Sequence, residues 1–297
     1  MKMTEEFLNY LRYERNRSEL TVSTYEQGLN SFEAYFLHRD SQLSWESVDS
    51  DIIRDWMESM MDKGDMASTV NNRLSAVRSF FRFALARKLV AKDPAYAVRG
   101  PKKQKPLPKF VREEEMNRLI DDVYSLSQDT YEDLRARTII IILYETGIRL
   151  AELVALNDDD VDFVNHQLKV TGKRNKQRIV PFGPEMEATL KEYIRQRDEQ
   201  GLRLEPAALI LGNAGRRVSR TMVSNIVSRS LSLVTTQKKK SPHVLRHSFA
   251  TAMLNHGAGL ESVRKLLGHE SVATTEIYTH TTFEQLKRVY ENAHPRA

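Results

Sequence analysis

Residues 130–147, TYEDLRARTIIIILYETG, decide the fold class of the second half of this chain. Four consecutive isoleucines give the middle of this stretch the β-branched content of a buried strand. Thr130, or Asp129 before it, can instead cap a helix, and Gly147 can end that helix. The apolar pattern is also too long for one strand. We therefore predict a helix over residues 131–146.

Around this helix the sequence predicts further helices and one small sheet. Alternating residues at 167–171 and 177–182 flank a polar loop with a basic character, which is the pattern of a hairpin. Further helices are predicted over residues 107–123, 148–157, 184–200, 221–233, 242–256, 260–267 and 271–279. The second half is therefore expected to be a mixed α+β domain.

The first half has apolar residues at helical spacing throughout. Helices are predicted over residues 4–15, 21–37, 51–62 and 68–89, the last of them capped by Ser68. Helices that follow one another so closely form a compact bundle. The fold class predicted for the whole chain is mainly α with a small β-sheet.

Charge and proline mark the boundary between the two halves. Residues 1–98 hold 13 Lys/Arg and 15 Asp/Glu, whereas the remaining 199 residues hold 32 and 25. Residues 99–112, RGPKKQKPLPKFVR, contain six basic residues, three prolines and no acid, as in an extended linker that can lie along phosphates. We predict a helical domain at 1–98, a linker at 99–109 and a second domain at 110–297.

Composition excludes several classes of protein. The 297 residues are 40% hydrophobic and 29% charged, which is ordinary for a globular chain. The absence of cysteine excludes disulfides, thiolate metal sites and thiol nucleophiles. No apolar run approaches the ~18 residues of a membrane span, and the first residues lack a signal-peptide core. A cytoplasmic location is expected, and the net charge of +5 favours a polyanionic partner.

The stretch 241–257, SPHVLRHSFATAMLNHG, starts with a capping serine and a proline and ends at a glycine, so it is predicted to be one helix. His243, Arg246 and His247 lie three or four residues apart on it and share a face. Zinc proteases hold their metal with histidines at this spacing, but they need a glutamate where this chain has Val244. A cation between two histidines favours an oxyanion over a metal ion.

Several other polar residues stand apart from the core pattern. Arg149 follows a helix-ending glycine and precedes Glu152 by three residues, a spacing at which the two side chains form an ion pair. Lys173 lies in the loop of the predicted hairpin, and His269 follows another glycine. Tyr278 lies in a polar stretch, although taken alone it also fits a core aromatic of a surface helix.

Together these residues fit nucleophilic attack on a phosphodiester without a metal. Arg149 and Arg246 can hold the two nonbridging oxygens and neutralise the charge of the pentacoordinate state. Tyr278 can attack phosphorus, but its phenol has a reference pKa near 10 and needs a base. His243 can be that base.

The departing sugar oxygen needs an acid. Lys173 can protonate it, and Lys176 in the same loop is chemically able to do so as well. His269 can donate a further hydrogen bond to the phosphate. Because a phosphotyrosine keeps the energy of the broken ester, rejoining needs no nucleotide, and neither a cofactor nor a metal is expected.

The segments TGIRLAEL, GKRNKQRIVPF, SPHVLRHSFAT, LLGH and YTH, in this order, resemble those of the tyrosine recombinases. The first-half patterns STYEQGLNSFEAYF and NNRLSAVRSFFRFA make the resemblance closest to the Xer recombinases, over essentially the whole chain. The family pattern maps onto Arg149, Lys173, His243, Arg246, His269 and the nucleophile Tyr278, with Glu152 as support.

The resemblance implies a helical, SAM-like core-binding domain and a catalytic domain that form a clamp around double-stranded DNA. It implies cleavage to a 3′-phosphotyrosine at a dif-like site, passage through a Holliday junction, and resolution of chromosome dimers. The expected partners are a second Xer recombinase, or further copies of this chain, in a tetramer, and a septal DNA translocase. An apolar face of Phe283, Leu286, Val289 and Tyr290 is expected to pack into a neighbouring protomer.

Further cations are predicted to contact the DNA backbone, although such side chains also serve solubility. They are Arg73, Arg78, Lys102, Lys103, Lys105, Lys176, Lys239 and Lys240.

Three alternatives remain open at the level of sequence. Integrases of mobile elements share the same residues, and the absence of an arm-binding domain before Met1 favours the Xer role. A DNA-binding protein without catalytic activity would keep the phosphate-binding cations. A metalloenzyme built on His243 and His247 is the third class.

Overall fold

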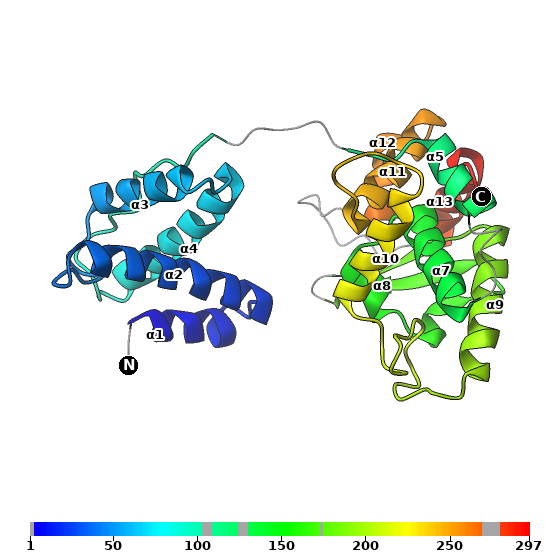
Figure 1. The fold of residues 1–297 in the computed structure, drawn as a ribbon, viewed down its shortest axis with the longest axis horizontal. Helices are drawn as coiled ribbons and strands as arrows, with labels where there is room; N and C mark the ends of the chain where they lie inside the picture. Colours follow the sequence, from blue (N-terminus) through cyan, green and yellow to red (C-terminus); the bar gives the residue numbers. More distant parts are fainter. Residues whose placement is uncertain (1–2, 103–108, 124–129, 173–174, 269–279) are drawn as a thin grey trace. The chain divides into compact units, whose positions relative to one another are not determined.

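The computed structural model of the chain (Figure 1) describes residues 3–102, 109–123, 130–172, 175–268 and 280–297, with the backbone alone at 280–284. The chain divides into two compact units, Met1–Pro106 and Leu107–Ala297, here called the helical unit and the C-terminal unit. None of the helices in these described ranges has the length and apolar character needed to span a membrane.

The helical unit consists of helices packed around one aromatic core. Its elements are α1 (Met3–Asn9), continued by a π-helical turn (Tyr10–Glu14), α2 (Glu19–Arg39), α3 (Ser50–Asp62) and α4 (Ala67–Ala86). Phe32 and Trp56 are almost completely buried, with ring centroids 4.9 Å apart. The prediction of helices here is confirmed, apart from the start of α4. That helix begins before Ser68, because the Met66 carbonyl already accepts from the amides of the third and fourth residues after it.

The C-terminal unit is mixed, as predicted. Its elements are α5 (Glu113–Asn117), continued by a π-helical turn (Arg118–Val123), α7 (Tyr131–Thr146), α8 (Leu150–Ala155), a 3-10 turn (Asp158–Asp160), β1 (Val161–Asp162), β2 (Gln167–Thr171), β3 (Gln177–Pro181), α9 (Pro184–Glu199), α10 (Arg220–Ser232), α11 (Pro242–Asn255), α12 (Leu260–Leu267) and α13 (His280–Ala293). The helix predicted over 271–279 lies outside the described residues.

The helix predicted from residue 107 begins later, at Glu113. The backbone is extended at Arg112, whose amide donates to the Glu115 carboxylate at 3.0 Å in a capping box. The amide of Val111 donates to Ser248 Oγ at 2.8 Å. A tertiary contact therefore takes the place of the first predicted turn.

Helix α7 is the central element of the C-terminal unit and confirms the prediction for the isoleucine-rich stretch. Thr130 Oγ1 caps it by accepting from the amide of Asp133 at 3.1 Å, and Gly147 ends it in the left-handed conformation, with φ of 59°. The four isoleucines are completely buried, and α7 packs against α9, α10 and α11 (Figure 1). The β-branched run is therefore a helix that is apolar on all sides.

The sheet is antiparallel in the order β1-β2-β3, so the predicted hairpin is confirmed and β1 is an additional short strand. Register pairs Val170 with Arg178 and Leu168 with Val180. The three apolar members of these pairs are completely buried. Arg178 therefore lies on the buried face of β3, because alternate residues of a strand share one face.

Helix α13 packs on its own unit. Leu286 and Tyr290 are buried in one cluster with Phe249 of α11 and Leu266 of α12, while Val289 is partly buried against the same cluster. We expected this face to pack into a neighbouring protomer. In the isolated chain, Leu286, Val289 and Tyr290 instead pack against α11 and α12 of their own unit. The side chain of Phe283 lies outside the described residues.

Ionisable groups are buried where α13 meets α7. Tyr290 Oη donates to Glu145 Oε2 at 3.3 Å, and Glu145 is completely buried. Burial, with the nearby charge of Glu185, raises the pKa of Glu145 to about 8. Burial also lowers the pKa of His294 to about 3, so this imidazole is neutral at physiological pH.

Glu145→Gln is expected to flatten the pH dependence of stability. The folded-state pKa of Glu145 lies above its unfolded value of about 4.3, so between these two values the folded chain holds a proton that the unfolded chain has released. The free energy of unfolding of the wild type therefore falls as the pH rises through this window, by at most about 1.4 kcal/mol per pH unit relative to Glu145→Gln.

Urea denaturation of the full chain at several pH values, followed by circular dichroism, measures this difference. Both tryptophans lie in the helical unit, so their fluorescence reports its transition separately. Glu199→Gln, which changes an exposed carboxylate of α9, is the control and should keep the wild-type slope. Equal slopes for the wild type and Glu145→Gln would contradict the proposed protonation of Glu145.

Candidate active site

Three guanidinium groups meet at the C-terminal end of α12. Arg149 immediately precedes α8, Arg178 lies on β3 and Arg246 lies on α11. Arg178 Nε, Arg246 Nη2 and Arg149 Nη2 donate to the successive carbonyls of residues 266–268, at 2.9, 2.7 and 2.8 Å. The last carbonyls of a helix lack partners within it and carry partial negative charge, so cations stabilise this end. We call these three residues the arginine cluster.

Arg246 joins the ends of two helices. Its Nη1 donates to the carbonyl of Gly147, just after α7, at 2.6 Å, while its Nη2 holds the end of α12. Only 7% of the residue is exposed. Burial lowers the pKa of Arg246 to about 10, and the positive charges of Arg149 and Arg178 act in the same direction. The guanidinium remains charged at neutral pH.

Glu152 is the acidic member of the site, and its predicted ion pair with Arg149 is confirmed at 2.8 Å. Its Oε1 accepts from Arg149 Nη1 and from Arg178 Nη1, the latter at 3.0 Å. Its Oε2 accepts from the Arg149 amide and from Arg178 Nη2, both at 2.8 Å. Burial alone would raise the pKa of Glu152, but Arg178 and then Arg149 hold it at about 2.

The arginine cluster carries more positive charge than its carboxylate balances. Within the described residues, the three arginines surround Glu152, which offsets one of their charges. Burial is the main cause of the lowered pKa of Arg246, and Arg149 and Arg178 lower this pKa further because both disfavour its charged form. Such an arrangement can hold an oxyanion with planar, directed donors.

Sequence reasoning missed Arg178. The register of the hairpin was the signal that could have found it, since Arg178 shares a strand face with the apolar Val180. A charged residue on the buried face of a strand requires a buried partner. The partner, Glu152, lies 26 residues away in sequence.

On helix α11, Arg246 and the two histidines lie in different surroundings. Arg246 reaches inward to the carbonyls, whereas His243 and His247 are exposed. Burial, His243 and Arg246 lower the pKa of His247, which favours its neutral form. Ser241 precedes the helix but its side chain makes no capping bond there. The described residues contain no group of three or more side chains that could hold a metal ion.

Three predicted catalytic residues, Lys173, His269 and Tyr278, lie outside the described residues, as do the predicted DNA contacts Lys103 and Lys105. Described residues precede two of them in the chain. A Cβ placed on Gly172 would lie 3.3 Å from Glu152 Oε1, so this glycine is next to the carboxylate. The carbonyl of Gly268 accepts from Arg149.

The predicted DNA contacts of the helical unit are partly engaged within it. Arg73 forms an ion pair with Asp65 at 2.8 Å, and Arg78 donates to the carbonyl of Val98. Asn71 Nδ2 donates to the carbonyl of Pro101 at 2.8 Å, so the chain still lies on α4 there. The remaining described members of the set, Lys102, Lys176, Lys239 and Lys240, are exposed or half-buried.

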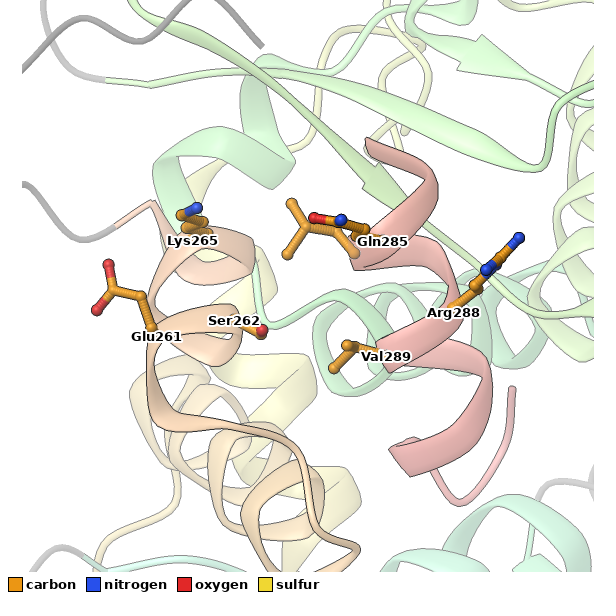
Figure 2. A pocket seen from close by; sticks show the side chains of 7 residues that line it. Glu261, Ser262, Lys265, Gln285, Arg288 and Val289 are labelled. Carbon is orange, nitrogen blue, oxygen red and sulfur yellow. The ribbon is translucent and has the colours of Figure 1, made fainter. Parts of the chain in front are cut away.

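A hollow of about 360 Å³ lies between α12 and α13 (Figure 2). Ser262 of α12 and Val289 of α13 point toward it from opposite sides. Glu261, Lys265 and Arg288 give its rim charges of both signs. The partly buried edge of the α13 apolar face therefore lines this hollow.

Family models and known proteins match this chain over nearly its whole length. Residues 109–285 match the Phage integrase family, and residues 4–88 match its N-terminal SAM-like domain. Tyrosine recombinase XerC of Chlorobaculum parvum is 38% identical over 99% of this chain and 94% of its own length. Tyrosine recombinase XerD of Oceanobacillus iheyensis is 32% identical over 99% and 98%.

Solved structures share the fold. XerH site-specific recombinase in a post-cleavage complex with palindromic difH has a TM-score of 0.72 at 23% identity, covering 96% of this chain and 83% of that one. The Tn1549 transposon integrase in complex with transposon right-end DNA has a TM-score of 0.73 at 19% identity, covering 97% and 99%.

The chain belongs to the phage integrase family, the tyrosine recombinases, and to its Xer branch. Enzymes of this family cut and rejoin DNA through a phosphotyrosine intermediate.

Gly268→Ala is expected to destabilise the C-terminal unit more than Gly257→Ala. Both glycines have a left-handed φ, of 64° and 85°, so either alanine is strained by roughly 1–2 kcal/mol. A Cβ at Gly268 would also meet the guanidinium of Arg178 at 3.1 Å, whereas a Cβ at Gly257 meets nothing within 4 Å. Urea denaturation followed by circular dichroism compares the two. An equal decrease in the free energy of unfolding for the two variants would mean that Arg178 moves aside without cost.

Proposed function

We propose that this chain is a site-specific recombinase that cuts and rejoins DNA at a dif-like site and thereby resolves chromosome dimers. The observation that carries the proposal is the arginine cluster, whose excess positive charge fits the oxygens of a phosphodiester. In its transition state this group gains charge, which fixed guanidinium donors stabilise most.

The nucleophilic step uses groups on two sides of the phosphate. Arg149 and Arg246 hold the nonbridging oxygens, and Tyr278 Oη forms the new bond to phosphorus. His243 takes the phenolic proton. The exposed position of His243 at the start of α11, one turn before Arg246, supports this role.

The bond from phosphorus to the 5′ oxygen breaks in the same step. Lys173 gives this oxygen its proton, and His269 donates a hydrogen bond to the phosphate. The products are a 3′-phosphotyrosine and a free 5′-hydroxyl. Attack by the 5′-hydroxyl of the partner duplex reverses the chemistry and releases the tyrosine, so no nucleotide is consumed.

The assembly follows from the chain's relatives, which are XerC and XerD proteins over nearly their full length. We propose a core-binding domain at 1–98, a linker at 99–109 and a catalytic domain at 110–297, which together grip the duplex. Four protomers, of this chain alone or with a second Xer recombinase, exchange strands in the cytoplasm under the control of a septal DNA translocase. The predicted lysines and arginines contact the DNA backbone.

A nicked suicide duplex carrying the chromosomal dif-like sequence tests the chemistry. Wild-type protein should become covalently attached to the 3′ side of the cut, because the short 5′-hydroxyl strand diffuses away. Tyr278→Phe should form no adduct, while Tyr13→Phe, which removes the hydroxyl of an exposed tyrosine, should behave as wild type. Denaturing gels and peptide mapping of the adduct measure both.

The same assay separates the alternative classes. Cleavage should continue undiminished in excess EDTA; loss of activity with the chelator would favour a metalloenzyme. A wild-type protein that binds this duplex and never forms the adduct would support a DNA-binding protein without catalytic activity, and would overturn the proposal.

Arg149→Ala and Arg246→Ala should each slow adduct formation by at least ~100-fold, as does the loss of an oxyanion donor. DNA affinity should change far less, because many other phosphate contacts remain. Arg195→Ala, which removes an exposed arginine of α9, is the matched control and should leave the rate unchanged. Single-turnover cleavage and gel-shift titration at one salt concentration provide the two quantities. An equal fall in both would mean that these arginines only position DNA.

A further inference from the structure

Arg178 is almost completely buried, and its guanidinium contacts other residues of the site. It is 7% exposed, donates to both oxygens of Glu152, and holds the Leu266 carbonyl at 2.9 Å. The two bonds to Glu152 form the parallel fork that a guanidinium makes with a carboxylate. Arg178 therefore fixes the plane of Glu152 from the sheet side.

The same carboxylate orients Arg149. Glu152 accepts from the amide and from Nη1 of Arg149, at 2.8 Å each, while Arg149 Nη2 holds the Gly268 carbonyl. Arg149 is the most exposed member of the arginine cluster, with 40% of its side chain accessible. An exposed arginine samples many rotamers unless its partners hold it. The position of Arg149 thus depends on a carboxylate that Arg178 holds in turn.

Arg178 also supports the turn that ends α12. It holds the Leu266 carbonyl, and its guanidinium lies 3.1 Å from the position that a Cβ on Gly268 would take. Removing Arg178 leaves one buried carbonyl without its donor and one buried carboxylate with half of its partners. The carbonyl is that of Leu266 and the carboxylate is that of Glu152, which binds Arg149.

We propose that Arg178 is a positioning residue for recombination: through Glu152 it aligns Arg149, and through the Leu266 carbonyl it holds the end of α12. The inference rests on the proposed function, since it assigns a role within the same reaction. We assign Arg178 no contact with the phosphate, because all three of its guanidinium nitrogens, Nε included, already donate to Glu152 and Leu266.

Protonation of Glu152 distinguishes this role from simple packing. Within the part of the chain that the structure describes, the charged groups that face this carboxylate are Arg149 before α8, Arg178 of β3 and Arg246 of α11. Without Arg178, burial raises the pKa of Glu152, because the strongest opposing partner is gone. A protonated Glu152 accepts fewer hydrogen bonds from Arg149, so the alignment is lost as the pH falls.

The test compares Arg178→Met, Arg178→Lys and Arg135→Met in the full chain. Arg135 is the matched control, since it is a buried arginine of the same unit that binds the Leu211 carbonyl and Asn213. Arg178→Met should cleave the suicide duplex about 10- to 100-fold more slowly with DNA affinity little changed, as when a partner that orients a catalytic group is lost. Arg178→Lys restores one charge without the fork and should give an intermediate rate.

The pH profile is the decisive readout. The ratio of the Arg178→Met rate to the wild-type rate should fall as the pH is lowered, whereas the ratio for Arg135→Met should stay constant. A constant ratio for Arg178→Met, or an equal loss of rate and of DNA affinity, would overturn the proposal and leave Arg178 a structural residue.

A second measurement is independent of cleavage. Carbon-detected NMR titration of the Glu152 carboxyl should show a higher pKa in Arg178→Lys, and in Arg178→Met if it folds, than in the wild type. An unchanged pKa would overturn the inference even where cleavage is slow. If the wild type forms no adduct, the proposed function fails, while the titration still decides whether Arg178 controls Glu152.

Discussion

The end of α12 is the constraint on which the C-terminal unit depends. Three successive carbonyls there, two of them in buried bonds, each accept from a donor of another element. The donors come from the start of α8, from β3 and from α11, so one helix end ties three separate segments together. The same contacts bring three positive charges into close proximity. The same hydrogen bonds therefore satisfy the backbone carbonyls and hold the three arginines together.

Within the described residues, this arrangement holds more positive than negative charge. Glu152 satisfies Arg149 and Arg178, while Arg246 is buried with its donors on carbonyl dipoles, and its pKa is lowered to about 10. Burial of like charges is unfavourable in itself, and an incoming oxyanion relieves it. Fixed positive charge of this kind stabilises the negative charge that develops on a phosphate in the transition state.

Elements with strong local signals could be predicted from the sequence. The capping threonine and the terminal glycine identified α7 as a helix despite its four isoleucines, and alternation identified the β2–β3 hairpin. The pair of Arg149 and Glu152 followed from their spacing at the start of α8. Such features depend on residues a few positions apart. The start of α5 could not be predicted, because the amide of Val111 bonds to Ser248, 137 residues away.

The sequence by itself thus determined the fold class, the two halves and the residue types proposed to bind a phosphodiester. Only the tertiary structure decided how these residues are held. Arg178 joins Glu152, 26 residues away, to Leu266, 88 residues away, and the apolar face of α13 is covered by α11 and α12 of its own unit. Alternation in β3 can indicate that Arg178 is buried, but no local pattern indicates its partner, because a buried charge finds its partner only when distant segments pack.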